Sequence, residues 1–305
     1  MYLKKHTSIC LLQAISPVHA GSGSATGAVD LPIQRERHTG WPHIQASGVK
    51  GAFRDHCERV WMLKDIQVEK LVSKEKRQQA LELANRIFGQ AEGSHAQAGA
   101  ISFSDARLLA FPVRSNVAPF VWVTCPALLN RFARDLELSG QTVPNLAETT
   151  VQMDCYCALA GEITGKVILE DICLDPQNQD CPDLAEFFAG YLPNIERLLL
   201  IPDDHFSFLV ETATEIQAQI KIKPETGTTQ DGSLRYEELL PADTLLYTLV
   251  FFGDERADQE NMIMTDMLKQ SVQNAIASHI QIGGDMTLGR GIFQVEWKEM
   301  DKEDK

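Results

Sequence analysis

The sequence predicts a fold of mixed α and β structure, because helical and strand-like patterns alternate along its 305 residues. Some stretches place apolar residues at helical spacing and end at a helix-stopping residue, whereas shorter runs are rich in β-branched and aromatic residues. Because 44% of the residues are hydrophobic, the chain can bury a substantial core, as one large domain or two modest ones.

The first strand is predicted over 8–18, where the apolar run SICLLQAISPV ends beside a proline. A helix follows over 47–63, with Ser47 as its N-cap. Its apolar stripe consists of Phe53, Cys57, Val60 and Trp61. Lys50 and Arg54 lie four residues apart on a neighbouring face, and cations beside the free N–H groups of a helix N-terminus form an anion site.

A second helix is predicted over 74–88, because its pattern stops at Gly89, a natural residue to follow a helix. Strand-like runs over 101–111 and 120–124 come next. A helix that starts with proline is then predicted over 126–140.

Short strands are predicted near 151–159 and 165–169. The Pro, Cys and Asp residues of 172–183 predict an insertion loop. The run 205–222 is interpreted as a strand that leads into the polar Gly/Thr tract 223–233, which predicts a long exposed hairpin or arm.

The C-terminal part is predicted to contain a strand over 243–252 and one long helix over 257–279. A glycine-rich loop between two strand-like runs occupies 279–297. The charged tail 298–305 is expected to be disordered.

Composition excludes several classes of protein. No apolar run approaches the ~20 residues needed to span a bilayer, and the first residues lack the pattern of a signal peptide, so we expect a cytoplasmic protein with no membrane partner. Seven cysteines, an odd number, predict no disulfide framework. Cys155 and Cys157 are separated by one residue rather than the two of a zinc knuckle, so we expect no metal cluster.

The net charge of −14 is unevenly distributed. Residues 1–60 contain seven basic and four acidic residues, a balance of +3, which leaves −17 for the remainder. This distribution suits a protein that meets nucleic acid through one groove, with its other surfaces solvated or packed on partner subunits.

The glycines that follow the first strand do not form a nucleotide site. Gly21, Gly23 and Gly27 are spaced G-x-G-x-x-x-G, and no helical pattern follows them directly, so the dinucleotide fingerprint fails. The stretch GEITGK at 161–166 has one residue too few for a P-loop and is followed by valine rather than Ser or Thr.

Three segments carry a family resemblance: HAGSGSATGAVDLPIQRERHTGWPHIQASGVKGAFR at 19–54, LRYEELLPADTLLY at 234–247 and IQIGGDMTLGRGIF at 280–293. Together they resemble the RAMP superfamily, and specifically the repeating backbone subunit of the type III-B CRISPR effector, the Cmr complex. The resemblance implies a single domain over 1–305 with a ferredoxin-like, RNA-recognition-motif-type core, large insertions and a β-hairpin thumb at about 211–240. The implied partners are a CRISPR guide RNA, a complementary target RNA, further copies of the chain in a helical filament and other Cmr subunits.

The family also implies cleavage of the target RNA, once per subunit, and the residues suggest how. RNA supplies its own nucleophile in the 2′-OH, and Asp30 is the one carboxylate in the loop 19–35. A fixed pair of metal ions needs several carboxylates, so we expect one Mg²⁺ or Mn²⁺ ion, held transiently by Asp30 and RNA oxygens. The alternative is that Asp30 is an ordinary turn residue and the subunit is a non-catalytic RNA-binding scaffold.

Three further residues are catalytic candidates with open alternatives. His19 is either a general acid or base, or a residue that positions the loop backbone. Glu237 and Glu238 either supply an acid from the thumb side or close the base of the hairpin. Gln217 and Gln219 occupy a strand where the resemblance would lead us to expect an arginine.

Basic side chains and glycines are expected to contact RNA phosphates without reading the sequence, as a guide-programmed complex requires. The backbone N–H groups of glycines can approach RNA where a Cβ would obstruct. The predicted RNA-binding residues are Arg35, Arg37, Ser47, Lys50, Arg54, Gly283, Gly284, Gly289, Arg290 and Gly291.

Overall fold

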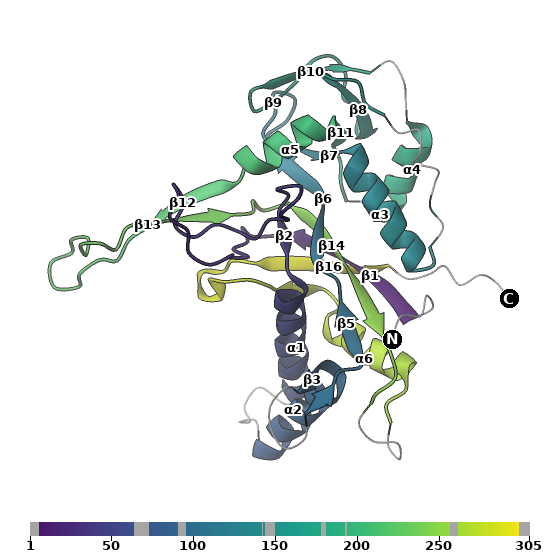
Figure 1. Ribbon diagram of the computed structural model, residues 1–305, viewed down its shortest axis with the longest axis vertical. Coiled ribbons are helices and arrows are strands. Elements are labelled where there is room, and N and C mark those ends of the chain that lie inside the picture. Colours follow the sequence, from purple (N-terminus) through teal and green to yellow (C-terminus); the bar gives the residue numbers. More distant parts are fainter. Residues whose placement is uncertain are drawn as a thin grey trace.

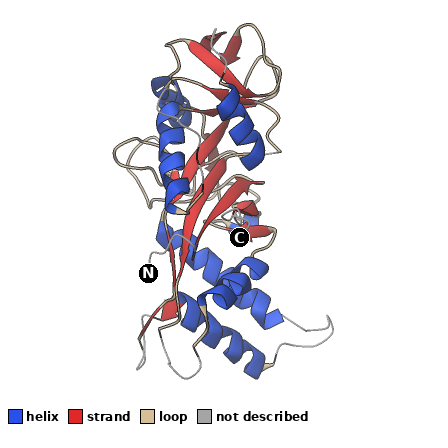
Figure 2. Cartoon of the chain, turned by 90° about the vertical axis from the view of Figure 1, so that its right-hand side faces the viewer, coloured by secondary structure: helices blue, strands red, loops and turns tan. Residues whose placement is uncertain are grey.

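The computed structural model describes residues 6–63, 73–90, 96–141, 143, 150–177, 181–192, 194–256 and 262–298. A large sheet runs along the long axis, with helices gathered at the lower end and a smaller group of strands and helices at the upper end (Figure 1). The side view in Figure 2 shows the same arrangement. Within the described ranges, no helix has the length and apolar character that crossing a membrane requires.

The main sheet contains twelve strands among the described residues. Its main path is β15 (His279–Gln281), β16 (Ile292–Lys298), β1 (Thr7–Ala14), β14 (Leu245–Phe252), β6 (Ala106–Val113), β7 (Val121–Thr124), β11 (Leu198–Leu200), β8 (Cys155–Ala160), β10 (Ile172–Pro176) and β9 (Val167–Leu169). Beside this path, β2 (His43–Ile44) pairs with β6 and β5 (Ile101–Phe103) pairs with β14. The central pairs around β1 and β14 are antiparallel, so their facing residues share one side of the sheet.

Helices cover both faces of this sheet. They are α1 (Ala46–Leu63), α2 (Lys74–Phe88), α3 (Pro126–Leu138), α4 (Pro182–Tyr191), α5 (Asp203–Thr212) and α6 (Thr265–Ala275), with a short 3₁₀ turn at Met286–Leu288. On one face, Phe53 of α1 packs edge-on against Trp297 of β16, with ring centroids 6.1 Å apart. On the other face, Phe132 of α3 packs against Tyr247 of β14 at 4.8 Å. The apolar stripes of both helices are therefore buried against the same sheet from opposite sides.

Among the described residues, two small hairpins lie outside the main sheet. β12 (Glu215–Gln219) and β13 (Arg235–Leu239) form an antiparallel hairpin where the sequence predicts one, and it projects away from the body (Figure 1). β3 (Gly89–Gln90) and β4 (Gln97–Ala98) form the other, directly after α2. Gly89 has a φ of 89°, so this helix ends as predicted, at a glycine in a conformation that other residues rarely adopt.

The structure confirms the first strand, the first three predicted helices and the strand, glycine loop and strand of 279–297, within a few residues at each end. The helix predicted over 257–279 is shorter, because α6 begins at Thr265 after the extended residue Met264, and 257–261 lie outside the described residues. All but the first residue of the predicted tail 298–305 also lies outside them.

Two of the expectations were wrong. The first half of 205–222 is the helix α5 rather than a strand, because Phe206, Leu209 and Val210 recur at helical spacing and are buried. The insertion loop predicted over 172–183 instead contains β10 and the start of α4. Both α4 and β11 were missed, since each is a short apolar run without a distinctive period.

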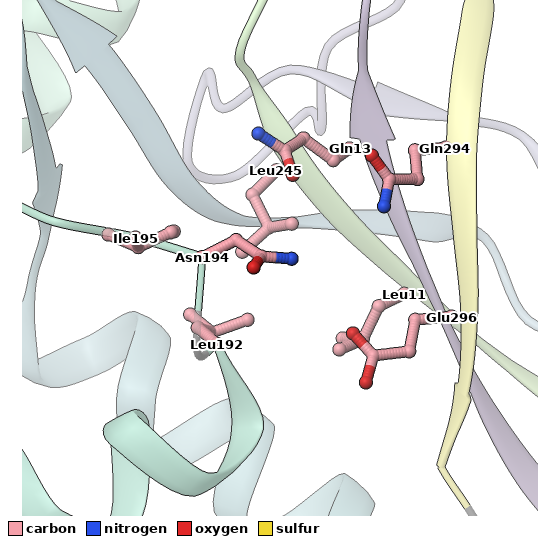
Figure 3. A pocket seen from close by; sticks show the side chains of 8 residues that line it. All are labelled: Leu11, Gln13, Leu192, Asn194, Ile195, Leu245, Gln294 and Glu296. Atoms are coloured by element: carbon pink, nitrogen blue, oxygen red, sulfur yellow. The ribbon is translucent and has the colours of Figure 1, made fainter.

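A small cavity lined by both polar and aliphatic side chains lies between the sheet and the segment after α4. Gln13 of β1 and Gln294 of β16 face each other in register, and their amides project into the same space as Asn194 (Figure 3). The cavity has a volume of about 30 Å³, which suits a single water molecule. It is too small for a nucleotide, so a functional site has to be sought elsewhere.

Candidate functional site

Three segments that are distant in the sequence meet at the base of the β12–β13 hairpin. The loop 15–42 pairs with the hairpin through a backbone bridge between Val18 and Leu240, with both N–O distances at 2.9 Å. The loop between β15 and β16 is bound to the same segment, because the N–H of Gly284 donates to the carbonyl of His19 at 2.8 Å. The candidate catalytic residues are thereby brought together: His19 and Asp30 from the first segment, and Glu237 and Glu238 from the hairpin.

Asp30 lies where the loop reaches the second hairpin strand. Its Oδ2 accepts a hydrogen bond from the backbone N–H of Tyr236 at 2.7 Å, and its own N–H donates to the carbonyl of Tyr236 at 3.1 Å. Among the described residues, Oδ1 has no hydrogen-bond partner, and the residue is only partly buried. One oxygen therefore fixes the loop while the other remains available to a ligand.

Glu238 is held by groups of the protein itself. One oxygen, Oε1, accepts hydrogen bonds from Arg35 Nη2 at 2.6 Å and from the Thr214 hydroxyl at 2.9 Å. The other, Oε2, accepts the backbone N–H of Ile33 at 3.0 Å. This set of partners matches the structural alternative, in which Glu238 closes the base of the hairpin.

His19 is enclosed by backbone and glycines, with only 12% of its side chain exposed. Its Nδ1 lies 2.9 Å from the carbonyl oxygen of Glu238, and its Nε2 lies 3.5 Å from Glu237 Oε1. A Cβ on Gly21 would approach Nε2 to 2.6 Å, and a Cβ on Gly283 would approach the His19 carbonyl oxygen to 2.7 Å. Gly21 therefore allows the chain to pass close to the imidazole, and Gly283 allows it to pass close to the His19 backbone.

Glu237 is the most enclosed carboxyl group at this junction, with 2% of its side chain exposed. Gln219 donates to its Oε2, and Arg290 Nη2 approaches the same oxygen to 3.9 Å. Burial raises the pKa of Glu237, and a hydrogen bond with Asp285 raises it further, while the charges of His19 and Arg290 act in the opposite direction.

The predicted RNA-binding cations fall into two groups. Arg37 is exposed and Lys50 is partly exposed, and neither has a hydrogen-bond or ion-pair partner among the described residues. The other three are bound within the chain. Arg35 contacts Glu238 and the carbonyls of Gly40 and Val210. Arg54 contacts Asn85 and the Gly89 carbonyl, and Arg290 contacts Gln217, Glu237 and Asp285. The first group is therefore free to meet phosphates without breaking an internal contact.

The helix N-terminus differs from the prediction. Because α1 begins at Ala46, Ser47 lies inside the first turn and is not its N-cap. The N–H of Ala46 donates to Asp105 Oδ1 at 2.7 Å, so a carboxylate of the protein already occupies part of the predicted anion site. Ser47 itself is exposed.

The four glycines of the C-terminal loop also differ in role. Gly284, Gly289 and Gly291 use their N–H groups within the chain, donating to the carbonyls of His19, Met286 and Pro17. A Cβ on Gly291 would lie 2.1 Å from the Ile282 carbonyl oxygen, which excludes any other residue there. These three N–H groups stabilise the loop. Gly283 and Gly284 are nevertheless exposed on the surface of the loop.

The described residues contain no group of three or more His, Cys, Asp or Glu side chains that could hold a metal ion. Asp30 could supply one oxygen ligand, and the remaining ligands of a divalent cation would have to come from bound RNA or water.

Sequence reasoning missed Asp285. The residue has a φ of 54°, a conformation that Asp adopts more readily than most residues, and its carboxylate points toward Arg290 Nε at 3.7 Å. The available signal was an acidic residue between glycines in a loop already expected to matter.

Comparisons with known proteins agree on one family. The model of the RAMP superfamily matches residues 11–294. A relative from Pyrococcus furiosus, the CRISPR system Cmr endoribonuclease Cmr4, is 38% identical over 95% of each chain. The crystal structure of oligomeric Cmr4 from the same organism is 35% identical, with a TM-score of 0.65 over 96% of this chain and 99% of that one. A chain of a type III-B Cmr-beta complex in its apo state, 22% identical, shares the fold with a TM-score of 0.71 over 97% and 98% of the two chains.

Proposed function

Because this chain belongs to the RAMP superfamily, we propose that it is the repeating backbone subunit of a cytoplasmic type III-B CRISPR effector complex. In this role it binds the guide RNA, stacks with further copies of itself and other Cmr subunits, and cuts complementary target RNA once per subunit. The 38% identical relative is named an endoribonuclease, and the 35% identical structure is oligomeric, which supports both parts of the proposal.

The observation that carries the nuclease proposal is the position of Asp30. Its carboxylate is anchored through Oδ2 to the hairpin backbone and leaves Oδ1 without a protein partner among the described residues. An oxygen ligand that is held rigidly but is not used by the protein suits a divalent cation, Mg²⁺ or Mn²⁺, shared with an RNA phosphate.

RNA chemistry determines the remaining requirements. The 2′-OH attacks the adjacent phosphate once the two are aligned, giving a 2′,3′-cyclic phosphate and a 5′-hydroxyl. The protein has to hold the nucleotide in line and offset the charge that develops on the phosphate. We assign the second task to Asp30 with its cation, and the support of the surrounding loop to His19, Glu237 and Glu238.

Guide binding is assigned to the exposed cations. Arg37 and Lys50 lie on the loop 15–42 and on α1, and neither is used within the described part of the chain. Phosphate contacts of this kind hold a guide of any sequence. The exposed backbone at Gly283 and Gly284 lies beside the same loop and can approach RNA closely.

We also assign a ferredoxin-like core to this subunit. The order β1, α1, β6, β14, α6, β16 follows the β-α-β-β-α-β pattern of that fold, and both helices pack on one another. The remaining elements, including the hairpin, are then insertions into this core.

Reconstitution tests the proposal directly. The chain is assembled with guide RNA and the other subunits, and cleavage of a complementary RNA is measured with and without Mg²⁺. Periodic cuts that require the cation support the nuclease role. Assembly and target binding without any cut at this subunit would instead identify a scaffold.

A further inference from the structure

The ion pair of Asp285 and Arg290 lies beside Glu237, and apart from the prediction that Arg290 contacts RNA it has no role so far. Arg290 Nε lies 3.7 Å from Asp285 Oδ2, and its Nη2 lies 3.9 Å from Glu237 Oε2. Neither Nε nor Oδ2 has a hydrogen-bond partner within the described structure, although both atoms are buried. Burying charged atoms lowers the stability of the fold unless they pair with each other or with a neighbouring charge.

We propose that Asp285 and Arg290 are positioning residues for the cleavage site, which fix the charge and orientation of the Glu237 carboxyl and, through it, of the His19 imidazole. This inference rests on the proposed function, because it assigns a task to residues that surround the Asp30 loop. Neither residue is required to touch RNA.

The hydrogen-bond directions determine where protons lie. The carbonyl oxygen of Glu238 can only accept, so His19 Nδ1 carries a hydrogen. His19 Nε2 then faces Glu237 Oε1 at 3.5 Å, and two bare lone pairs would repel each other there. A hydrogen on either atom would relieve this repulsion, so the charge of Glu237 and the orientation of His19 are linked.

The charges that surround Glu237 act on the same pair of groups, Glu237 and His19. Two carboxyl groups, Glu237 and Asp285, face one guanidinium, Arg290, and the amides of Gln217 and Gln219 complete the surroundings without charge. Full ionisation with a neutral imidazole would leave one negative charge in a site where Glu237 is 2% exposed. Burial and the neighbouring Asp285 both raise the pKa of the Glu237 carboxyl group, which favours its protonated form.

The two positioning residues consequently act with opposite sign. Asp285 favours retention of the proton by adding negative charge, and Arg290 opposes it by adding positive charge. Removing either one changes the charge that Glu237 and His19 present to the loop.

The geometry of Asp285 allows a clean substitution. Its φ of 54° is tolerated by Asn as well as by Asp, so Asp285→Asn removes the charge without imposing a new backbone conformation. Arg290→Gln removes the cation. The exposed pair Asp55 and Arg59 on α1, joined by an ion pair at 3.0 Å, offers matched controls in Asp55→Asn and Arg59→Gln.

The first measurement follows the Glu237 carboxyl carbon by NMR during a pH titration of the full chain. We expect its titration midpoint to fall in Asp285→Asn, to rise in Arg290→Gln and to remain unchanged in both control variants. Equal midpoints in wild type and both cluster variants would overturn the proposal. Because no RNA is present, this result does not depend on nuclease activity.

The second measurement uses the assembled complex and the pH dependence of target cleavage. If the protonated cluster is the active form, the alkaline limb of the rate profile moves to lower pH in Asp285→Asn and to higher pH in Arg290→Gln. A uniform loss of rate at every pH would indicate a merely structural pair and would reject the positioning role. Absence of cleavage by the wild-type complex would reject the nuclease function instead, and the NMR result would stand.

Discussion

The Oδ2 atom of Asp30 accepts a hydrogen bond from the backbone N–H of Tyr236, 206 positions away in the sequence, at 2.7 Å. This bond ties the glycine-rich loop to the second strand of the projecting hairpin. It holds one carboxylate oxygen in place and leaves the other free within the described structure. The hairpin therefore determines where the proposed catalytic group lies.

Asp30→Asn should separate cleavage from binding. The amide oxygen can still accept the Tyr236 N–H, so the loop keeps its anchor, but the charge that recruits a cation is lost. Cleavage by the assembled complex should fall by about 10²-fold or more, while guide-dependent assembly and target binding persist. A target with deoxyribose at the cut site should resist the wild-type complex. Normal cutting by Asp30→Asn would make the loop structural, and cutting of the deoxy target would exclude the 2′-OH mechanism.

Gly21→Ala tests whether the glycine-rich loop is built around His19. The added Cβ would lie 2.6 Å from His19 Nε2 and would force the ring to shift from its present position. We expect cleavage to fall by roughly 10- to 100-fold, since a misplacement of about 1 Å can cost on the order of 10²-fold. Gly27→Ala is the matched control, because a Cβ there has open space around it. Equal losses in the two variants would point to RNA contact along the whole loop.

Lys50 and Arg54 should differ although they share a helix face. Lys50→Ala should reduce the slope of log affinity against log salt for guide binding by about 0.7, as expected for one lost phosphate contact on a single strand. Arg54→Ala should instead lower the free energy of unfolding by about 1–3 kcal/mol, because it removes the bonds from α1 to Asn85 and the Gly89 carbonyl. Salt titrations and denaturant unfolding measure the two effects. A change of salt slope in Arg54→Ala alone would reverse the assignment.

The tract 223–233 at the hairpin tip should matter for assembly and not for folding. Its internal bonds, such as Lys223 N–H to the Thr228 carbonyl at 2.8 Å, are local to the tip. Replacing the tract with a tight turn should leave the thermal unfolding midpoint unchanged but impair filament formation on guide RNA, which electron microscopy can follow. Filaments with normally spaced cuts would reduce the tract to an ordinary surface loop.

Cys157 and Cys181 should be the pair of thiols that joins under oxidation. Their sulfur atoms lie 3.2 Å apart, between β8 and the residue that precedes α4. Exchange with a small-molecule disulfide would form the Cys157–Cys181 bond and reduce the reagent to two thiols, with two protons and two electrons transferred. Peptide mapping without reductant should identify this cross-link, which Cys181→Ser abolishes and Cys173→Ser preserves. Closing the loop between Cys157 and Cys181 should raise the free energy of unfolding by about 3 kcal/mol. A cross-link through Cys173 would contradict the geometry.

Helices and strands that are determined by neighbouring residues were predicted correctly, whereas those that depend on distant contacts were not. α2 was assigned correctly because its apolar spacing and Gly89 lie within one short stretch. α5 was misassigned because the apolar residues of HFSFLV fit both a strand and a helix, and burial of Phe206 and Leu209 depends on the rest of the protein. Tertiary contacts decide such cases.

The candidate site was predictable only in part for the same reason. Asp30 and His19 were singled out because the loop has an unusual composition, and Glu237 because it lies in a recognisable segment, and their roles stay predictions. The enclosure of Glu237 by Asp285 and Arg290 joins a strand to a distant loop, and no sequence period encodes that approach. The internal use of Arg35 and Arg54 was equally hidden, since a lone arginine looks the same in an ion pair and on an RNA-binding surface.

The position of β1 has a consequence for how the protein is made. This strand, the first element of the described chain, pairs on one side with β14 and on the other with β16. Both neighbours come far later in the sequence than β1, so at about 5–20 residues per second they emerge from the ribosome more than ten seconds after it. In the nascent chain, β1 therefore lacks both of its native neighbours until β14 has been synthesised. The junction of Asp30, Glu237 and Arg290 joins equally distant segments, so it too can form only after the loop that carries Arg290 has been synthesised.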